Sequence, residues 1–319
     1  MGRRIEVGIE GNPGSATLGG GLALNPFLVM SMSGKARLLG LRAEQFRHPL
    51  DLEATRALQQ LPGLDVLVRM VVAPLAESFF HLENLASGLQ VSERQLPSLH
   101  RSLVEACQIL DLEVPQLYVR QNPVPNAYTF AMRGERPFIV VHTALLELLT
   151  PEETQAVIAH ELGHLKCDHS LYLTVANLIT LAASQLPFGP DIAQGLQNRL
   201  MEWVRCAEFT CDRAALLVAQ DPRIVASLLM KLCGGAPSLV SELSVDAFMD
   251  QARAYDDLSQ DALGDALKQL RTQGLTHPVP VLRAREIDRW ASSPAYGALV
   301  KSRPIAYNEN ASTGGWRNW

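Results

Sequence analysis

His160, Glu161 and His164 form the pattern His-Glu-x-x-His, in which the residue types and their spacing suit metal-assisted hydrolysis. Residues four apart lie one above the other on a helix face, so both imidazoles can reach one metal ion. The carboxylate of Glu161 can contact a water beside that ion and accept its proton. The pattern favours a zinc-dependent hydrolase, and the alternative is a chance match on an ordinary amphipathic helix.

The segment that carries this pattern has strong signals for a helix. Thr150 is a suitable N-cap, Pro151 suits the first helical position, and Glu153 can complete a capping box. No proline follows before Pro187. We therefore expect a helix that begins at residue 151 and carries both histidines on one face.

Two zinc-binding histidines need a third protein ligand and an open position for water. The continuation His-x-x-Gly-x-x-His fails here, because Cys167 stands at the glycine position and Ser170 at the position of the third histidine. His169 is one residue out of register and is a weak candidate ligand. The third ligand is therefore expected from another segment.

A second predicted helix supplies better candidates. Apolar residues recur at helical spacing across residues 201–218, and Glu208 and Asp212 share one face of that helix. One carboxylate can bind the metal while the other accepts the spare N–H of a zinc-bound histidine. The alternative is an acidic helix face exposed to solvent.

Together these residues, with Arg205 just before Glu208, resemble the M48 family of zinc endopeptidases, which includes bacterial heat-shock membrane proteases and CAAX prenyl proteases. The resemblance covers roughly residues 91–290. It implies a zincin fold of the gluzincin type, which is α+β, mainly helical, with a small mixed sheet beside the zinc helix. Cys211 departs from the family pattern, which usually has alanine there, but it is small enough to pack in the same place.

Two further segments match the family. Asn126 and Ala127 resemble its Asn-Ala segment, which precedes the strand that lines the substrate cleft, and His277 with Arg283 resembles its His-Pro-x-x-x-x-Arg segment. The resemblance implies that His277 supports the oxyanion or plugs the open zinc position in a resting state. It also implies that Arg283 pairs with Asp212 and that Asn126 holds the substrate backbone.

The amino-acid sequences of residues 125–128, 141–145 and 164–169 are similar to those of a soluble-looking cyanobacterial and plastid branch of the family. The expected cofactor is one Zn²⁺ per chain, held by His160, His164 and Glu208. The expected substrates are polypeptides.

Charge and cysteine usage limit the class of protein. The net charge of −5 gives no electrostatic case for nucleic-acid binding. The five cysteines are odd in number and none shows Cys-x-x-Cys spacing, which favours a reducing compartment without structural disulfides. Cys167, Cys206 and Cys211 lie near the proposed site in sequence, so a thiolate ligand is an alternative to buried, inert thiols.

The N-terminus does not resemble a signal peptide, because no apolar stretch follows Arg3 and Arg4. We expect a location in the cytoplasm or an organelle stroma. Two apolar stretches, 64–82 and 170–188, are expected to pack on the protein or to lie along a membrane surface rather than to span it. Peripheral membrane contact is therefore an open alternative, and the sequence does not indicate the oligomeric state.

We divide the chain into a flexible glycine-rich extension (1–45), a helical segment packed on or beside the peptidase (46–90), the peptidase domain (91–290) and a C-terminal tail (291–319). Within the second region, Asp51 is expected to cap a helix that ends before Pro62.

Within the peptidase domain we expect a helix at 93–112 and strands at 117–120, 128–132 and 137–142, with a hairpin turn at 133–136. A sheet edge beside the zinc would let a substrate peptide add as an extra strand. The function expected is a zinc endopeptidase of protein quality control. The alternative is a latent or inactive zinc-bound scaffold that binds peptides as a chaperone does.

Overall fold

The computed structural model describes residues 34–60, 63, 66, 68, 70, 73–131, 137–185, 189–257 and 278–301. His277, the expected hairpin turn and most of the expected N-terminal extension lie outside the described residues. So does the C-terminal stretch 302–319.

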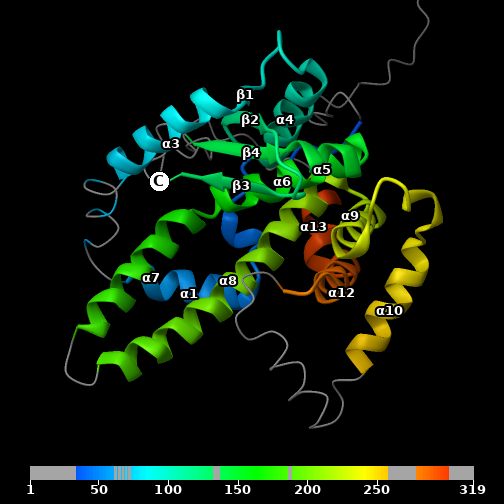
Figure 1. The fold of residues 1–319 in the computed structure, drawn as a ribbon. Helices are drawn as coiled ribbons and strands as arrows, with labels where there is room; N and C mark the ends of the chain where they lie inside the picture. The colour runs from blue at the N-terminus through cyan, green and yellow to red at the C-terminus, as the bar shows by residue number, and fades with distance from the viewer. Residues whose placement is uncertain are drawn as a thin grey trace, which may run out of the picture.

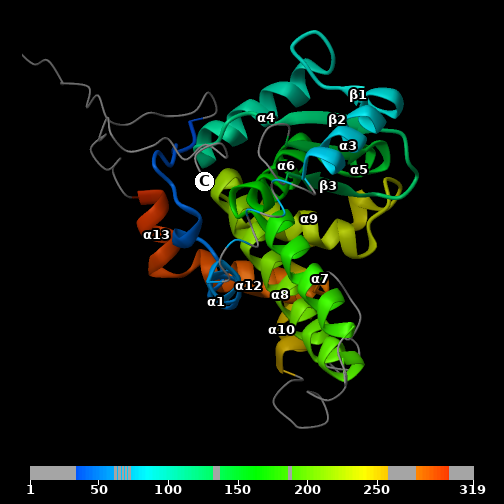
Figure 2. The same cartoon turned by 90° about the vertical axis from the view of Figure 1, so that its left-hand side faces the viewer.

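The helices, in chain order, are α1 (Pro49–Gln59), α3 (Ala73–Ser87), α4 (Pro97–Leu110), α5 (Thr143–Leu148), α6 (Pro151–Lys166), α7 (His169–Ser184), α8 (Gly189–Ala219), α9 (Pro222–Gly234), α10 (Val245–Asp257), α12 (Pro280–Ala291) and α13 (Pro294–Lys301). Short 3₁₀ turns, η1 and η3, lie at Ala43–Gln45 and Val240–Glu242. The mainly helical α+β fold expected from the sequence is confirmed. In Figures 1 and 2, α7 and α8 form a hairpin that extends away from the sheet.

A small mixed sheet covers one side of the helical core. Its strands are β1 (Leu89–Gln90), β2 (Gln116–Arg120), β3 (Ala127–Phe130) and β4 (Phe138–His142), in the spatial order β1-β2-β4-β3. Strands β2 and β4 pair in parallel, and the other two pairings are antiparallel. The three strands expected from the sequence are present, and β3 forms an edge of the sheet that packs against α6 (Figure 1).

The centre of the core is the contact between α6 and α8. Nearly every residue of α6 is buried, so this helix lacks the polar face of a surface helix. The two helices lie in close contact at Gly163, where an added Cβ would lie 2.9 Å from the Cβ of Ala214 and 3.1 Å from the Cα of Cys211. Only a residue without a side chain permits this approach.

The start of α6 agrees with the sequence prediction. The Thr150 hydroxyl accepts a hydrogen bond from the Glu153 N–H at 3.3 Å, and the Glu153 carboxylate accepts one from the Thr150 N–H at 2.8 Å. This reciprocal capping box satisfies two backbone donors that the helix itself leaves without partners. Glu153 also pairs with the buried Lys231 of α9 at 2.6 Å, which ties the start of α6 to a neighbouring helix.

Two expectations for the N-terminal part are wrong. Asp51 is not a helix cap: α1 begins at Pro49 with His48 in the N-cap position, and Asp51 is buried inside the protein. The end of the expected flexible extension is also packed, since Leu38 and Leu41 are buried in the main core. Sequence periodicity could not show this, because these two leucines lie outside any helix or strand.

Other element boundaries differ from the expected ones. Helix α4 begins at Pro97 rather than near residue 93, because Leu96 has a φ of +59° and stands outside the helix. Helix α8 contains 31 residues and begins a full twelve positions before the predicted helix at 201–218. Among the described residues, no helix is long and apolar enough to cross a membrane.

Candidate metal centre

Helix α6 presents His160 and His164 on one face, and α8 presents Glu208 opposite them. The two imidazole rings are nearly perpendicular, with centroids 5.2 Å apart. The Nε2 atoms of His160 and His164 lie 3.4 and 3.3 Å from the two carboxylate oxygens of Glu208. The structure therefore brings together three side chains that are far apart in sequence, at the place where α6 and α8 pack.

The other ring nitrogen of His160 is held by a carboxylate and an arginine. Its Nδ1 lies 3.0 Å from Asp212 Oδ1. Arg283 of α12 donates from Nε to Asp212 Oδ2 at 2.8 Å and from Nη2 to Asp212 Oδ1 at 2.6 Å. A bidentate pair of this kind fixes the carboxylate in one orientation, and the carboxylate fixes the plane of the imidazole.

The charges around His160 favour a cation at this position. Burial alone would lower the pKa of His160, but hydrogen bonds to Asp212 and Glu208 raise it to about 10. Burial alone would raise the pKa of Asp212, but Arg283 and His160 hold it below its ordinary value. The Asp212 carboxylate therefore stays ionised beside the histidine, and both Asp212 and Glu208 favour positive charge on His160.

Two imidazole nitrogens and one carboxylate are the protein ligands of several catalytic zinc sites, which keep one further position open. The geometry of His160, His164 and Glu208 fits this set, because both Nε2 atoms face one carboxylate within 3.4 Å. A metal ion bound between them would take the place of the proton that the carboxylates stabilise.

Cys211 is the alternative third ligand. Its Sγ and one nitrogen of each of His160 and His164 all lie within 4.8 Å of one another. Burial, however, raises the pKa of the Cys211 thiol well above its ordinary value, and its Sγ lies 3.7 Å from Nδ1 of His169. Glu208 is the better candidate, since its carboxylate faces the Nε2 atoms of both histidines.

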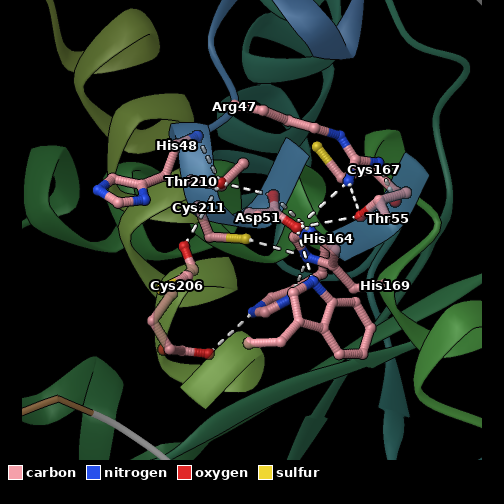
Figure 3. A network of polar contacts seen from close by, with 12 residues as sticks. Arg47, His48, Asp51, Thr55, His164, Cys167, His169, Cys206, Thr210 and Cys211 are labelled. Carbon is pink, nitrogen blue, oxygen red and sulfur yellow. Dashed lines mark hydrogen bonds and ion pairs between the residues drawn. The ribbon is translucent and has the colours of Figure 1, made fainter. Parts of the chain in front are cut away.

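The partner of the second histidine was not expected from the sequence. The Nδ1 atoms of His164 and His169 lie 2.9 Å apart, and Nε2 of His169 lies 3.2 Å from Asp51 Oδ2. Figure 3 shows His164, His169 and Asp51 within one network of polar contacts. The sequence suggests His169 only as a ligand and Asp51 only as a cap. No spacing rule could have joined them, because 118 residues separate the two.

The structure gives fewer contacts for the remaining predicted site residues. Glu161 follows His160 on α6 and is buried. Asn126 is exposed, directly precedes β3, and its carbonyl accepts a hydrogen bond from the His142 N–H at 2.9 Å. Ala127 is the first residue of β3. His277 lies outside the described residues, so the structure does not place it.

Comparison with known proteins identifies the family to which this chain belongs. The model of peptidase family M48 matches residues 92–291, which is more than half of the chain. The chain belongs to peptidase family M48. It is therefore a metallopeptidase that acts on polypeptides with a metal cofactor, and the expected resemblance to this family is confirmed.

M48 proteins from distant organisms are similar to this chain. Plastoglobule-localized metallopeptidase 48 of the Arabidopsis thaliana chloroplast is 55% identical over 262 residues, which are 82% of this chain and 76% of that protein. Protease HtpX homolog 2 of Methanosarcina mazei is 30% identical over 50% of this chain and 64% of that protein. The crystal structure of S. mikatae Ste24p covers 75% of this chain and 62% of its own, with 17% identity and a TM-score of 0.41.

Proposed function

We propose that this M48 protein is a zinc-dependent endopeptidase with one Zn²⁺ per chain, held by His160, His164 and Glu208. The observation that carries the proposal is the convergence of the two Nε2 atoms on the Glu208 carboxylate. Bound there, Zn²⁺ would supply a Lewis acid for the scissile carbonyl and lower the pKa of a nearby water.

The proposed role of Glu161 is that of general base. It precedes the second histidine by three positions on α6, and its carboxylate accepts the proton of the attacking water and returns it to the leaving amine. Asp212 and Arg283 keep the His160 ring in one orientation. This preserves the separation between the proposed ligand His160 and the proposed base Glu161. His277 is proposed to support the oxyanion, or to plug the site in a resting state.

The substrate is proposed to bind as an extended strand along β3. This strand forms an edge of the sheet and packs against α6, so its outer side offers main-chain groups next to the helix of His160 and His164. Pairing through main-chain atoms depends little on side-chain identity, and an enzyme that binds in this way accepts many unfolded sequences. Asn126 precedes this strand and is proposed to hold the substrate backbone.

We place the protein in protein quality control, in the cytoplasm or an organelle stroma, with peripheral membrane contact. The similar Arabidopsis protein is named for plastoglobules of the chloroplast, which supports an organelle stroma and a lipid surface. Helix α3 supports such contact, because Phe79, Leu82 and Leu85 are all more than half exposed.

The test is digestion of an unfolded protein such as casein, with fragments identified by mass spectrometry. Glu161→Gln should retain the metal and lose activity by about 10²- to 10⁴-fold, since proton transfer by a positioned carboxylate contributes about that factor. Glu152→Gln, the same chemical change at an exposed position of α6, is the matched control and should remain active.

Internal cuts that disappear in Glu161→Gln and after chelation would support the zinc endopeptidase. Bound zinc without any cuts in the wild type would instead favour the alternative of a latent enzyme or a peptide-binding scaffold. Activity equal to wild type in Glu161→Gln would remove this residue from the mechanism.

A further inference from the structure

A continuous chain of polar contacts leads from the site to the N-terminal helix. It runs from His164 to His169 at 2.9 Å and from His169 to Asp51 at 3.2 Å (Figure 3). His164 lies on α6, His169 begins α7, and Asp51 belongs to α1. Asp51 lies outside residues 92–291, the part of the chain that the family model matches.

The contact between two Nδ1 atoms requires one donor and one acceptor. A neutral histidine that binds a metal through Nε2 carries its hydrogen on Nδ1, so His164 is the donor. His169 then accepts at Nδ1 and carries its own hydrogen on Nε2. That hydrogen points to Oδ2 of Asp51, which as a carboxylate can only accept. Every contact of the chain is satisfied in this one arrangement.

Asp51 is well suited to hold this arrangement, because several donors fix its carboxylate. Thr210 donates to Oδ2 at 2.7 Å, Trp203 donates to Oδ1 at 2.9 Å, and Arg47 donates to Oδ1 at 3.3 Å. The side chain of Asp51 is completely buried. With the carboxylate fixed in this way, the ring of His169 has little freedom to turn.

A similar arrangement holds the first histidine, where Asp212 faces Nδ1 of His160. The two arrangements differ in one respect. The carboxylate that orients His160 lies on α8 within the matched domain, whereas the carboxylate that orients His164, through His169, lies on α1. Metal-binding histidines nearly always have such a partner, and its loss typically weakens metal affinity by about 10- to 100-fold.

We propose that His169 and Asp51 are positioning residues that fix the ring of His164 for metal binding, and that α1 is thereby a functional part of the metal centre. The proposal rests on the proposed ligand set, in which His164 binds Zn²⁺ through Nε2.

Zinc affinity of the full chain, measured by competition with a chromogenic chelator, tests this proposal without relying on proteolysis. His169→Phe keeps an aromatic ring beside Trp203 but cannot accept a hydrogen bond. His169→Asn places a carbonyl oxygen near the position of Nδ1 and can accept one. We expect zinc affinity about 10- to 100-fold weaker for His169→Phe and a smaller loss for His169→Asn, which restores the acceptor for His164 but not the contact with Asp51.

Asp51→Asn provides a second variant, so that the proposal stays falsifiable if His169→Phe does not fold. An amide nitrogen at position 51 that faces Nε2 of His169 would donate to it and move the hydrogen of His169 to Nδ1. The Nδ1–H groups of His164 and His169 would then face each other, and this repulsion would weaken zinc affinity. Glu153→Gln is the matched control, because it removes a buried ion pair of α6 that has no contact with the metal ligands. It should lower the melting temperature of the metal-free protein and leave zinc affinity unchanged.

The proposal is overturned if His169→Phe binds zinc as tightly as wild type, or if His169→Phe and His169→Asn lose affinity equally, which would indicate a packing role. If Glu153→Gln weakens zinc binding as much as Asp51→Asn does, general destabilisation explains the effect and the proposal also fails. A wild-type protein that binds no zinc would contradict the proposed function instead, so the two failures are distinguishable.

Discussion

Two buried lysines of this protein, Lys231 and Lys166, have different partners for their ammonium groups. Lys231 is buried in contact with Glu153 at 2.6 Å, so its charge is matched by a carboxylate. Lys166 is also almost completely buried, but its Nζ donates to the backbone carbonyl of Asp111 at 3.2 Å. Burial lowers the pKa of Lys166 to about 8, against the opposing effect of Asp111.

Lys166→Met is therefore expected to raise the free energy of unfolding of the metal-free protein by about 1–3 kcal/mol at pH 7. Because the folded protein releases the Lys166 proton near pH 8 and the unfolded chain near 10.5, the penalty is fully present below pH 8. The advantage of the variant should shrink as the pH rises from 8 to 10.5. Urea unfolding of both proteins across this range measures it.

Lys231→Met is the control for that experiment. It leaves the buried carboxylate of Glu153 without its cation and should lower the free energy of unfolding by about 3 kcal/mol. Equal effects of the two substitutions, in sign and size, would contradict the distinction between the two lysines.

The placement of residues on one helix face could be predicted from the sequence, whereas contacts that depend on tertiary packing could not. His160 and His164 share a helix face by spacing alone, as do Glu208 and Asp212. The pairing of Asp212 with Arg283 was expected from family resemblance, and the structure shows that contact at 2.6 Å. The sequence predicts a cap at Asp51 because a carboxylate near a helix start ordinarily caps it, and only the packing of α1 on α8 turns this one inward.

At the scale of elements, the proposed metal site depends on how closely α6 and α8 approach. Gly163 lies one residue before His164, and it faces Cys211 and Ala214 of α8. The start of α6 was predictable because a capping box lies within four residues of sequence. The true length of α8 was not predicted: Ile192, Leu196 and Leu200 recur at helical spacing in its first half, but Gly195 and the many polar residues there weaken the helix signal, and that half is largely exposed.

Gly163→Ala should push α8 away from α6 and separate Glu208 from the two histidines. We expect a loss of about 1–3 kcal/mol in the free energy of unfolding, the usual effect of overpacking a core, together with weaker zinc binding. Denaturant unfolding and chelator competition measure the two effects.

Gly195→Ala is the matched control on α8, where an added Cβ meets nothing within 4 Å. It should stabilise the protein by about 0.5–1 kcal/mol through helix propensity and leave zinc affinity unchanged. A Gly163→Ala protein with normal stability and affinity would show that the helices can separate without consequence.

At the scale of the whole molecule, segments that precede the matched domain contribute to its packing and surface. Residues 34–46 add Leu38, Leu41 and Phe46 to the main core. Helix α3 covers the sheet through Phe80, which packs against Phe130 and Phe138, while it turns Phe79 and Leu82 outward. The expected division at residue 45 therefore cuts through a packed segment, which composition alone could not reveal.

The outward face of α3 allows a test of peripheral membrane contact. Phe79 and Leu82 are 64% and 69% exposed, and burial of such a side chain in a lipid surface stabilises binding by about 1.5–3 kcal/mol. The double variant Phe79→Ser/Leu82→Ser should reduce co-flotation with phosphatidylcholine vesicles by about tenfold or more. Leu239→Ser, at another exposed leucine, should not change it. Failure of the wild-type protein to float with vesicles would contradict the membrane contact.

The shortness of β3 determines how long a peptide held along it would stay. Only four residues form this strand, and alternate residues of an edge strand point their main-chain groups outward, so about four hydrogen bonds are available. Each contributes about 1 kcal/mol net in water. Cleaved ends held there by so few bonds would have brief residence times, so their dissociation would not delay the next turnover. The rate of proteolysis would then follow the supply of extended chain, which for a folded substrate is set by the small fraction of time that it spends unfolded.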